Sequence, residues 1–179
     1  MKSAHAELVS AFVDTLLRSG DLHTEAVERA SRRVRRHEFL DHWYRLESSN
    51  SLPLWSRVDF DQDGPDPQIL STIYSDRSLV TGIAGDSPTT STSQPRLMAR
   101  MLEALDLGPG MRVLEIGTGT GYNTALLAET PGDPASIYSV ELRPEVSKQA
   151  GEALFQEGYA DVRLFAREGA LGGARGCAL

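Results

Sequence analysis

The stretch Val113-Leu114-Glu115-Ile116-Gly117-Thr118-Gly119-Thr120-Gly121-Tyr122-Asn123 decides the fold of this 179-residue chain. The short apolar run Val113–Ile116 predicts a buried parallel strand. Three glycines follow at alternate positions, and residues 124–129 then favour a helix. A strand, a glycine turn and a helix in this order bring bare backbone N–H groups and a helix N-terminus up to a ligand.

The residues around the glycines narrow the class of ligand. The dinucleotide pattern G-x-G-x-x-G would need its third glycine at position 122, which is Tyr122, and no Gly-Lys-Ser/Thr of a P-loop follows. Glu141 lies 20 residues past Gly121, at the end of a second candidate strand, Ser136–Val140. A carboxylate at that place can accept both hydroxyls of a ribose. The pattern therefore indicates a nucleoside-containing cofactor; the alternative is a glycine turn that merely packs a strand on a helix.

Composition excludes several classes of protein. A net charge of −7 argues against a nucleic-acid-binding surface as the main function, and the content of 40% hydrophobic and 24% charged residues is that of a globular domain. No apolar run approaches a membrane span, and the first residues lack the apolar core of a secretion signal. Cys177 is the one cysteine, so no internal disulfide can form, and we expect a cytoplasmic protein.

The residues before the glycine stretch predict mostly helix and loop. Apolar spacing indicates helices over 6–17, over 24–36 and from Pro95 onward. Segments 69–74 and 79–83 read as short strands, while 47–67 and 81–93 read as loops rich in Pro, Gly, Ser and Thr. The arginines at positions 32, 33, 35 and 36 favour a solvated helix end over a phosphate site. We interpret His37 and His42 as structural, because their spacing is not that of a helical zinc pair.

Four motifs, in this order along the chain, resemble one family. Val34-Arg35-Arg36-His37-Glu38-Phe39 is similar to the Val-Pro-Arg-His-x-Phe segment of protein-L-isoaspartate O-methyltransferases. Tyr74-Ser75-Asp76-Arg77-Ser78-Leu79 resembles their Tyr-x-Asp-x-Pro-Leu segment, and Ser91-Thr92-Ser93-Gln94-Pro95 resembles their Thr-Ile-Ser-Gln/Ala-Pro motif. The residues 107–119 continue the match into the glycine stretch. The chain departs from the family at Arg35 and Arg96 and in two longer loops, at 47–67 and 81–90; the loop changes bear on the substrate more than on the cofactor.

The resemblance implies an α/β fold with the Rossmann-like sheet of class I methyltransferases and an N-terminal helical extension. It divides the chain into an N-terminal helical and substrate-loop region, 1–95, and a partial S-adenosylmethionine-binding domain, 96–179. Glu168 stands where the family has the acid that meets the adenine amino group. The cofactor S-adenosylmethionine would then be held by Glu115, Gly117, Thr118, Gly119, Gly121, Tyr122, Asn123, Glu141, Leu142 and Glu168.

The residues after the third predicted strand, Val162–Phe165, do not continue the family pattern. From Val113 to the end there are 67 residues and three predicted strands, whereas the family fold has seven strands. The tail from Ala170 reads like a frameshift or a premature end. We therefore expect a sheet that is incomplete at its C-terminal side and a chain that is not by itself a competent enzyme.

The chemistry that the resemblance implies is methyl transfer to a carboxylate of an isoaspartyl or aspartyl residue in a protein or peptide. A carboxylate with a pKa near ~4 is already ionised at neutral pH, so no general base is required, and the sequence offers no conspicuous one. We expect Ser93 to orient the acceptor carboxylate through its hydroxyl, or to cap the helix that begins at Pro95. A non-catalytic cofactor-binding or partner-binding remnant and a methyltransferase acting on a small molecule remain alternatives. The natural acceptor and the oligomeric state stay open.

Overall fold

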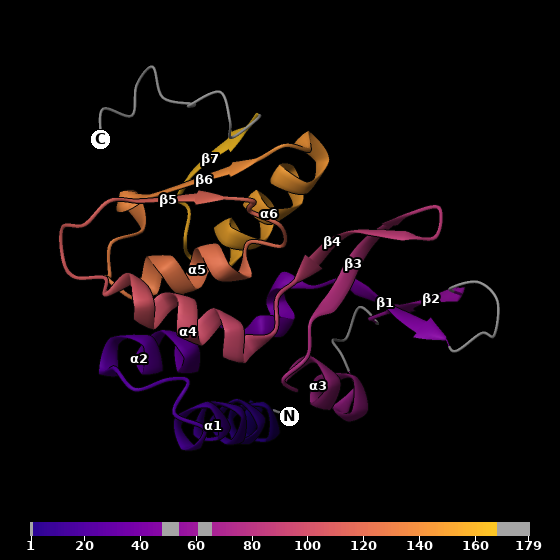
Figure 1. Cartoon of the computed structure of the whole chain (residues 1–179), viewed down its shortest axis with the longest axis horizontal. Helices are drawn as coiled ribbons and strands as arrows, with labels where there is room; N and C mark the ends of the chain where they lie inside the picture. Colours follow the sequence, from indigo (N-terminus) through magenta and orange to yellow (C-terminus); the bar gives the residue numbers. More distant parts are fainter. Residues whose placement is uncertain (1, 48–53, 61–65, 168–179) are drawn as a thin grey trace.

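The computed structural model describes residues 2–47, 54–60 and 66–167. Its C-terminal half contains a parallel sheet of the strands β5 (Val113–Ile116), β6 (Ile137–Glu141) and β7 (Arg163–Ala166), in the order β5-β6-β7. Val113 pairs with Ile137, and Tyr138 pairs with Arg163. The helices α5 (Tyr122–Glu129) and α6 (Pro144–Gln156) connect these strands and lie against one face of the sheet (Figure 1). This is the βαβαβ half of a Rossmann-like domain, as the glycine stretch predicts.

The layers beneath this sheet are helical. α2 (Glu25–Arg33) packs against α5, and α4 (Pro95–Leu105) and α1 (Lys2–Arg18) in turn contact α2 (Figure 1). One hydrophobic cluster runs through these layers, from Phe12 and Val27 through Leu102 to Leu126 and Ile137. The predicted helices at 6–17, 24–36 and from Pro95 are thereby confirmed, although the second gives way after Arg33 to a short 3₁₀ turn, η1 (Arg36–Phe39). The division into 1–95 and 96–179 stays a proposal, with a core shared across it.

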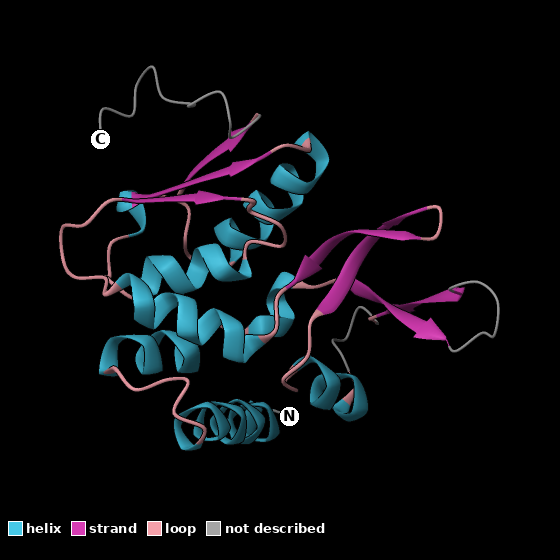
Figure 2. Cartoon of the chain, viewed as in Figure 1, coloured by secondary structure: helices cyan, strands magenta, loops and turns pink. Residues whose placement is uncertain are grey.

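The N-terminal half contains a second sheet that the sequence reading missed. Its four strands are β1 (His42–Glu47), β2 (Leu54–Asp59), β3 (Leu79–Ala84) and β4 (Ser87–Thr92), all antiparallel in the order β2-β1-β3-β4 (Figure 2). The strand predicted at 79–83 is confirmed. The prediction of loops at 47–67 and 81–93 is wrong in part, because the first range contains β2 and the second contains β4. The N-terminal region is therefore mixed α/β rather than a helical extension.

The strand predicted at 69–74 is also wrong, because this segment forms the helix α3 (Pro67–Ile73). Asp66 caps it: its Oδ1 accepts hydrogen bonds from the backbone N–H of Gln68 at 2.8 Å and of Ile69 at 2.9 Å. Pro67 occupies the first helical position, where its missing N–H costs nothing. A 3₁₀ turn, η2 (Pro134–Ser136), completes the elements by leading into β6.

The parallel sheet has an open edge at β5. Within the described ranges, β5 pairs with β6 alone, so its other edge carries unpaired N–H and C=O groups. Leu114 and Ile116 are 52% and 69% exposed, and Leu142 after β6 is 67% exposed. The helices cover the opposite face (Figure 1). The described strands thus build one side of β5 only, which confirms the expected incomplete sheet.

Across these same residues, none of the helices has the length and apolar character needed to cross a membrane.

Candidate functional site

The glycine loop between β5 and α5 has a backbone that requires its glycines. Gly117, Gly119 and Gly121 have φ angles of +96°, +55° and +87°, the left-handed region that side chains disfavour. Gly121 is the N-cap of α5, and a Cβ built on it would lie 3.4 Å from the Cβ of Ala150. The three glycines therefore let the chain turn sharply from β5 into α5 while α5 packs closely on α6.

Glu141 joins the end of β6 to this loop. Its Oε2 accepts a hydrogen bond from the backbone N–H of Gly119 at 3.1 Å, and its Oε1 accepts one from the N–H of Arg143 at 3.2 Å. The guanidinium of Arg143 lies 3.5 Å from Oε1, and Glu141 as a whole is only 5% exposed. The carboxylate that the sequence singled out from its spacing thus lies directly at the glycine loop. Each of its two carboxylate oxygens has a further lone pair that can accept a hydrogen bond from a ligand hydroxyl.

Glu115 supports the loop from within. Its Oε1 accepts a hydrogen bond from the Asn123 amide at 2.7 Å, and its Oε2 accepts bonds from the hydroxyls of Thr124 and Ser139. Burial raises the pKa of Glu115, and these three hydrogen bonds oppose that rise. Thr118, 4% exposed, bonds the Ser139 hydroxyl at 2.6 Å. The polar groups of Glu115 and Thr118 are therefore engaged in holding β5, β6 and α5 together.

Of the other predicted cofactor residues, Tyr122 has a buried side chain and Leu142 has an exposed one. The ring of Tyr122 is 3% exposed, with the Phe39 ring 5.9 Å away and the Arg36 guanidinium 5.8 Å from its centroid. Burial raises its pKa to about 12. Its side chain therefore belongs to the core, and its backbone N–H at the start of α5 donates to the Thr120 hydroxyl at 3.4 Å. Leu142 is exposed beside Glu141, while Glu168 lies outside the described residues.

Asn123 carries an unsatisfied oxygen at this place. Its amide nitrogen donates to Glu115, whereas its Oδ1 is buried without a hydrogen-bond partner. A buried acceptor without a donor costs free energy of about 1–3 kcal/mol. The loop region is therefore polar and incompletely satisfied, which is common at binding sites and rare in a packed core.

Ser93 lies on the segment that runs from β4 past the glycine loop into α4. The carbonyl oxygen of Ser91 is 3.8 Å from the position that a Cβ on Gly119 would take. The capping alternative for Ser93 is wrong, because the N-cap of α4 is Gln94, and no side-chain hydrogen bond caps that helix. The Ser93 side chain is half-buried, and its carbonyl oxygen accepts a hydrogen bond from Arg36 at 3.0 Å. The structure thus brings the segment of Ser93 against the loop at Ser91 and leaves the Ser93 hydroxyl uncommitted to the helix.

Arg36 holds this segment in place, and the sequence reading misjudged it. Its side chain is fully buried, and its guanidinium donates to the carbonyls of Ile73 at 2.8 Å, Arg77 at 3.1 Å and Ser93 at 3.0 Å. Burial lowers the pKa of Arg36. The expected solvated helix end is therefore wrong for this arginine, while Arg33 and Arg35 form ion pairs at the surface. Two sequence signals could have revealed it: Arg36 matches the arginine of the Val-Pro-Arg-His-x-Phe motif, and it lies between the apolar residues Val34 and Phe39.

The two histidines have side-chain partners. The Nδ1 atom of His37 lies 2.7 Å from the Tyr74 hydroxyl, and the Nδ1 atom of His42 lies 2.7 Å from a carboxylate oxygen of Asp41. These contacts agree with the structural interpretation of both residues. In the part of the chain that the structure describes, no group of three or more His, Cys, Asp or Glu side chains is arranged to hold a metal ion.

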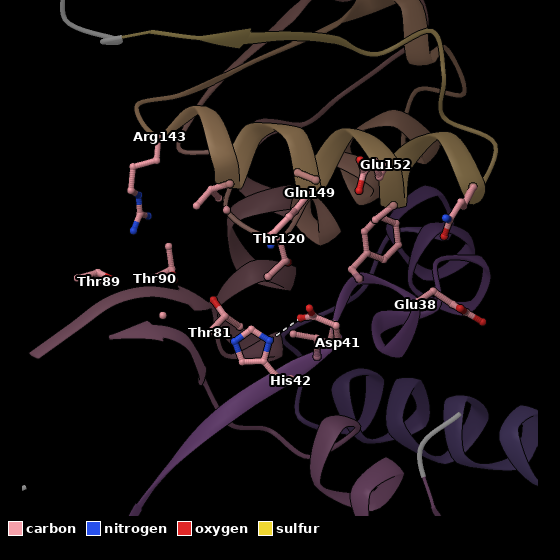
Figure 3. A pocket seen from close by; sticks show the side chains of 18 residues that line it. Glu38, Asp41, His42, Thr81, Thr89, Thr90, Thr120, Arg143, Gln149 and Glu152 are labelled. Carbon is pink, nitrogen blue, oxygen red and sulfur yellow. Dashed lines mark hydrogen bonds and ion pairs between the residues drawn. The ribbon is translucent and has the colours of Figure 1, made fainter. Parts of the chain in front are cut away.

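A cavity of about 340 Å³ opens beside the glycine loop (Figure 3). Gly119 and Thr120 form one wall, η1 and the start of β1 form another, and the β3–β4 hairpin and α6 close the remaining sides. The volume is at the lower end of the range for small-molecule sites, roughly 300–1,000 Å³. The loop therefore faces a space large enough for a small molecule or for part of a larger one.

Comparison with known proteins gives consistent matches. The family model "Protein-L-isoaspartate(D-aspartate) O-methyltransferase (PCMT)" matches residues 7–176. A protein-L-isoaspartate O-methyltransferase of Gloeobacter violaceus is 34% identical over 157 residues, which cover 88% of this chain and 60% of the relative. That of Methanothermobacter thermautotrophicus is 32% identical over 162 residues, covering 89% of this chain and 60% of the relative. The chain thus spans about 60% of the length of these curated relatives.

Solved structures extend the likeness to the fold. A structure titled protein-L-isoaspartate O-methyltransferase superposes with a TM-score of 0.66 at 28% identity, covering 90% of this chain and 42% of the other. A second structure, of a protein from Plasmodium falciparum described as a putative enzyme of this type in complex with S-adenosyl-L-homocysteine, gives a TM-score of 0.59 at 16% identity. It covers 88% of this chain and 62% of the other, and it supports the fold alone.

Proposed function

Because the chain belongs to the protein-L-isoaspartate(D-aspartate) O-methyltransferase family, we propose that it provides the cofactor-binding part of an S-adenosylmethionine-dependent carboxyl O-methyltransferase. The proposed acceptor is an isoaspartyl or aspartyl carboxylate of a protein or peptide. The observation that carries the proposal is the contact between Glu141 and the backbone N–H of Gly119, which joins the ribose-binding candidate to the glycine loop.

The residues at the loop fit S-adenosylmethionine. The glycine backbone leaves room for the close approach of a ligand, and Glu141 offers two carboxylate oxygens to ribose hydroxyls. Asn123 Oδ1 is an acceptor without a donor in the same region. We propose that Gly117, Gly119, Gly121 and the first turn of α5 hold the cofactor by their backbone, and that Leu142 and Glu168 contact its base.

The chain's own contribution to the reaction is positioning. When bound, the cofactor supplies an activated methyl group on a sulfonium. An acceptor carboxylate is ionised at neutral pH, so the protein has only to hold it in line with the methyl group and to exclude water. We propose that the Ser93 hydroxyl donates a hydrogen bond to the acceptor carboxylate. Arg36 acts through the Ser93 carbonyl to fix that segment, and Asp76 does so by accepting from the backbone N–H of Arg96 at 3.0 Å.

A second function, cofactor or partner binding without turnover, is favoured by the open edge of β5. The exposed Leu114 and Ile116 leave the centre of the family's sheet unsupported on one side. We therefore expect the 179-residue chain to bind the cofactor weakly and to show no detectable methylation by itself. As its cellular role we propose the repair of damaged proteins or the modification of a dedicated peptide, in the cytoplasm.

The test is transfer of a radiolabelled methyl group to an isoaspartyl peptide. The chain alone is compared with the chain joined to the C-terminal segment of a full-length relative. The proposal predicts turnover in the extended protein and little or none in the chain alone. Turnover on small carboxylic acids but not on the peptide would favour a small-molecule methyltransferase. An extended protein that binds S-adenosylhomocysteine without methylating either acceptor would favour the binding function. Clear turnover by the chain alone would contradict the expected inactivity.

A further inference from the structure

The cavity beside the glycine loop has a position that suits an acceptor molecule. Its walls come from four parts of the chain that the two halves of the fold bring together, and Gly119 and Thr120 of the loop are among its lining residues. A ligand in it would therefore touch the same loop that we propose holds the cofactor. The hairpin that forms one wall includes β4, which leads into Ser93 within the same segment.

Most charged side chains of the cavity lie toward two ends; Asp41 also lines it, between these ends, where it contacts the His42 ring at 2.7 Å (Figure 3). Arg143 is at one end together with Thr89 and Thr90, while Glu38 and Glu152 lie toward the other end and Thr120 lies between (Figure 3). Among the described lining residues, Arg143 is the one Lys or Arg. The Glu152 side chain is 62% exposed and lies 3.9 Å from Lys148, so it remains accessible to another cation. Glu38 is less available, because Arg35 already contacts it at 3.1 Å.

The spacing of these ends follows from α6. Arg143 precedes the helix and Glu152 lies nine positions later, which corresponds to about 14 Å along a helix axis. An extended peptide covers about 3.3 Å per residue, so about four residues bridge this distance. A peptide that pairs with both Arg143 and Glu152 therefore has an anionic group and a cationic group about four residues apart.

We propose that this cavity is the seat of the acceptor peptide, with its isoaspartyl residue at the Arg143 end and a basic side chain, three to five residues away, toward Glu152. The inference rests on the proposed function and adds to it a preference among peptide acceptors. Arg143 also contacts Glu141, so the acceptor end of the seat lies next to the proposed ribose site. Gln149 points into the middle of the cavity from α6, where a large side chain would block the peptide (Figure 3).

The first test is steric and uses the full chain. An isoaspartyl peptide with a lysine four positions away, in either direction, is titrated into the ¹⁵N-labelled protein with and without S-adenosylhomocysteine. We expect amide shifts at Thr89, Thr90, Thr120 and Gln149, and at least tenfold weaker binding by Gln149→Trp. The matched control is Glu145→Trp, since Glu145 is also exposed on α6 but does not line the cavity. Shifts confined to other surfaces, equal binding by Gln149→Trp, or no binding at millimolar peptide would each overturn the inference.

The second test concerns charge. Replacing the lysine of the peptide by alanine should weaken binding about two- to fivefold, as expected for one exposed ion pair, and glutamate should weaken it further. Glu152→Gln should abolish this preference, whereas Glu145→Gln should keep it. If Glu152→Gln still prefers the lysine-containing peptide, Glu152 does not contact the basic side chain, and that part of the proposal is wrong.

The two proposals can fail separately. Peptide shifts at the cavity in a protein that does not bind S-adenosylhomocysteine would support the seat and count against the proposed function. Methylation of the peptide by the extended protein, with Gln149→Trp as active as the unmodified sequence, would support the function and overturn the seat.

Discussion

Arg36→Met should be among the most destabilising single substitutions in this chain. The guanidinium is fully buried and donates at 2.8–3.4 Å to four carbonyls, so its loss leaves four acceptors without a charged donor; they belong to Ile73, Ser75, Arg77 and Ser93. A hydrogen bond to a charged group contributes about 1.5–3 kcal/mol, but the desolvation of the guanidinium offsets part of the total. We therefore expect the free energy of unfolding to fall by about 3–5 kcal/mol.

Urea unfolding followed by far-ultraviolet circular dichroism measures this directly. With a slope of roughly 2 kcal/mol per molar urea, the midpoint should fall by about 1.5–2.5 M. Arg36→Lys keeps the charge but has fewer donors, so its unfolding midpoint should lie between those of the unmodified protein and Arg36→Met. Arg33→Met is the matched control: this arginine is at the surface and pairs with Glu129, so its loss should cost at most about 1 kcal/mol. If Arg36→Met costs no more than Arg33→Met, the buried guanidinium does not hold the Ser93 segment, and the assigned role is wrong.

Two further substitutions test the neighbourhood of the site. In the extended protein, Ser93→Ala should lower methyl transfer more than cofactor affinity, because its hydroxyl caps no helix; a parallel fall of both with the melting temperature would refute the catalytic role. Asp21 accepts a hydrogen bond from Ser19 and contacts Arg96 and Arg100, and these partners, Ser19 first, lower the pKa of Asp21 to about 2. The unfolded chain, with a pKa of about 3.8, binds this proton more readily, so the stability from Asp21 is present above that pH and is lost as pH falls toward about 2. Asp21→Asn should flatten the acid side of the stability profile in urea unfolding at a series of pH values, and an unchanged profile would contradict this assignment.

The parallel half of the fold was predictable because its signals are local. The apolar run at Val113, the glycines and the prolines at helix starts each act within a few residues, and β5, α5, β6 and α6 form where they indicate. Glu141 was found by its spacing after Gly121, since the ends of neighbouring parallel strands meet at one edge of the sheet.

The antiparallel sheet was not predictable in the same way. Of its four strands β3 carries an apolar run, and that strand was predicted; β4 consists of Ser and Thr with Pro88, and β2 includes Ser56, Arg57 and Asp59, so apolar alternation does not mark these two. Pairing across the sheet, as between Tyr44 and Val80, stabilises the four strands instead. The burial of Arg36 was mispredicted for a related reason. Its hydrogen-bond acceptors are carbonyls 37 to 57 residues later in the chain, and the residues around Arg36 do not reveal them.

Calorimetric titration with S-adenosylhomocysteine, on the chain and on Glu141→Ala, tests the central claim that the glycine loop and Glu141 form the cofactor site. The loss of charge-assisted hydrogen bonds should weaken binding by about 1–3 kcal/mol, or about 5- to 150-fold. Glu145→Ala, an exposed acid four residues later on α6, should leave the affinity unchanged. Where the chain alone binds too weakly to measure, the same three titrations are made on the extended protein and its two variants. Equal affinity in the unmodified protein and Glu141→Ala would remove Glu141 from the site and contradict the account.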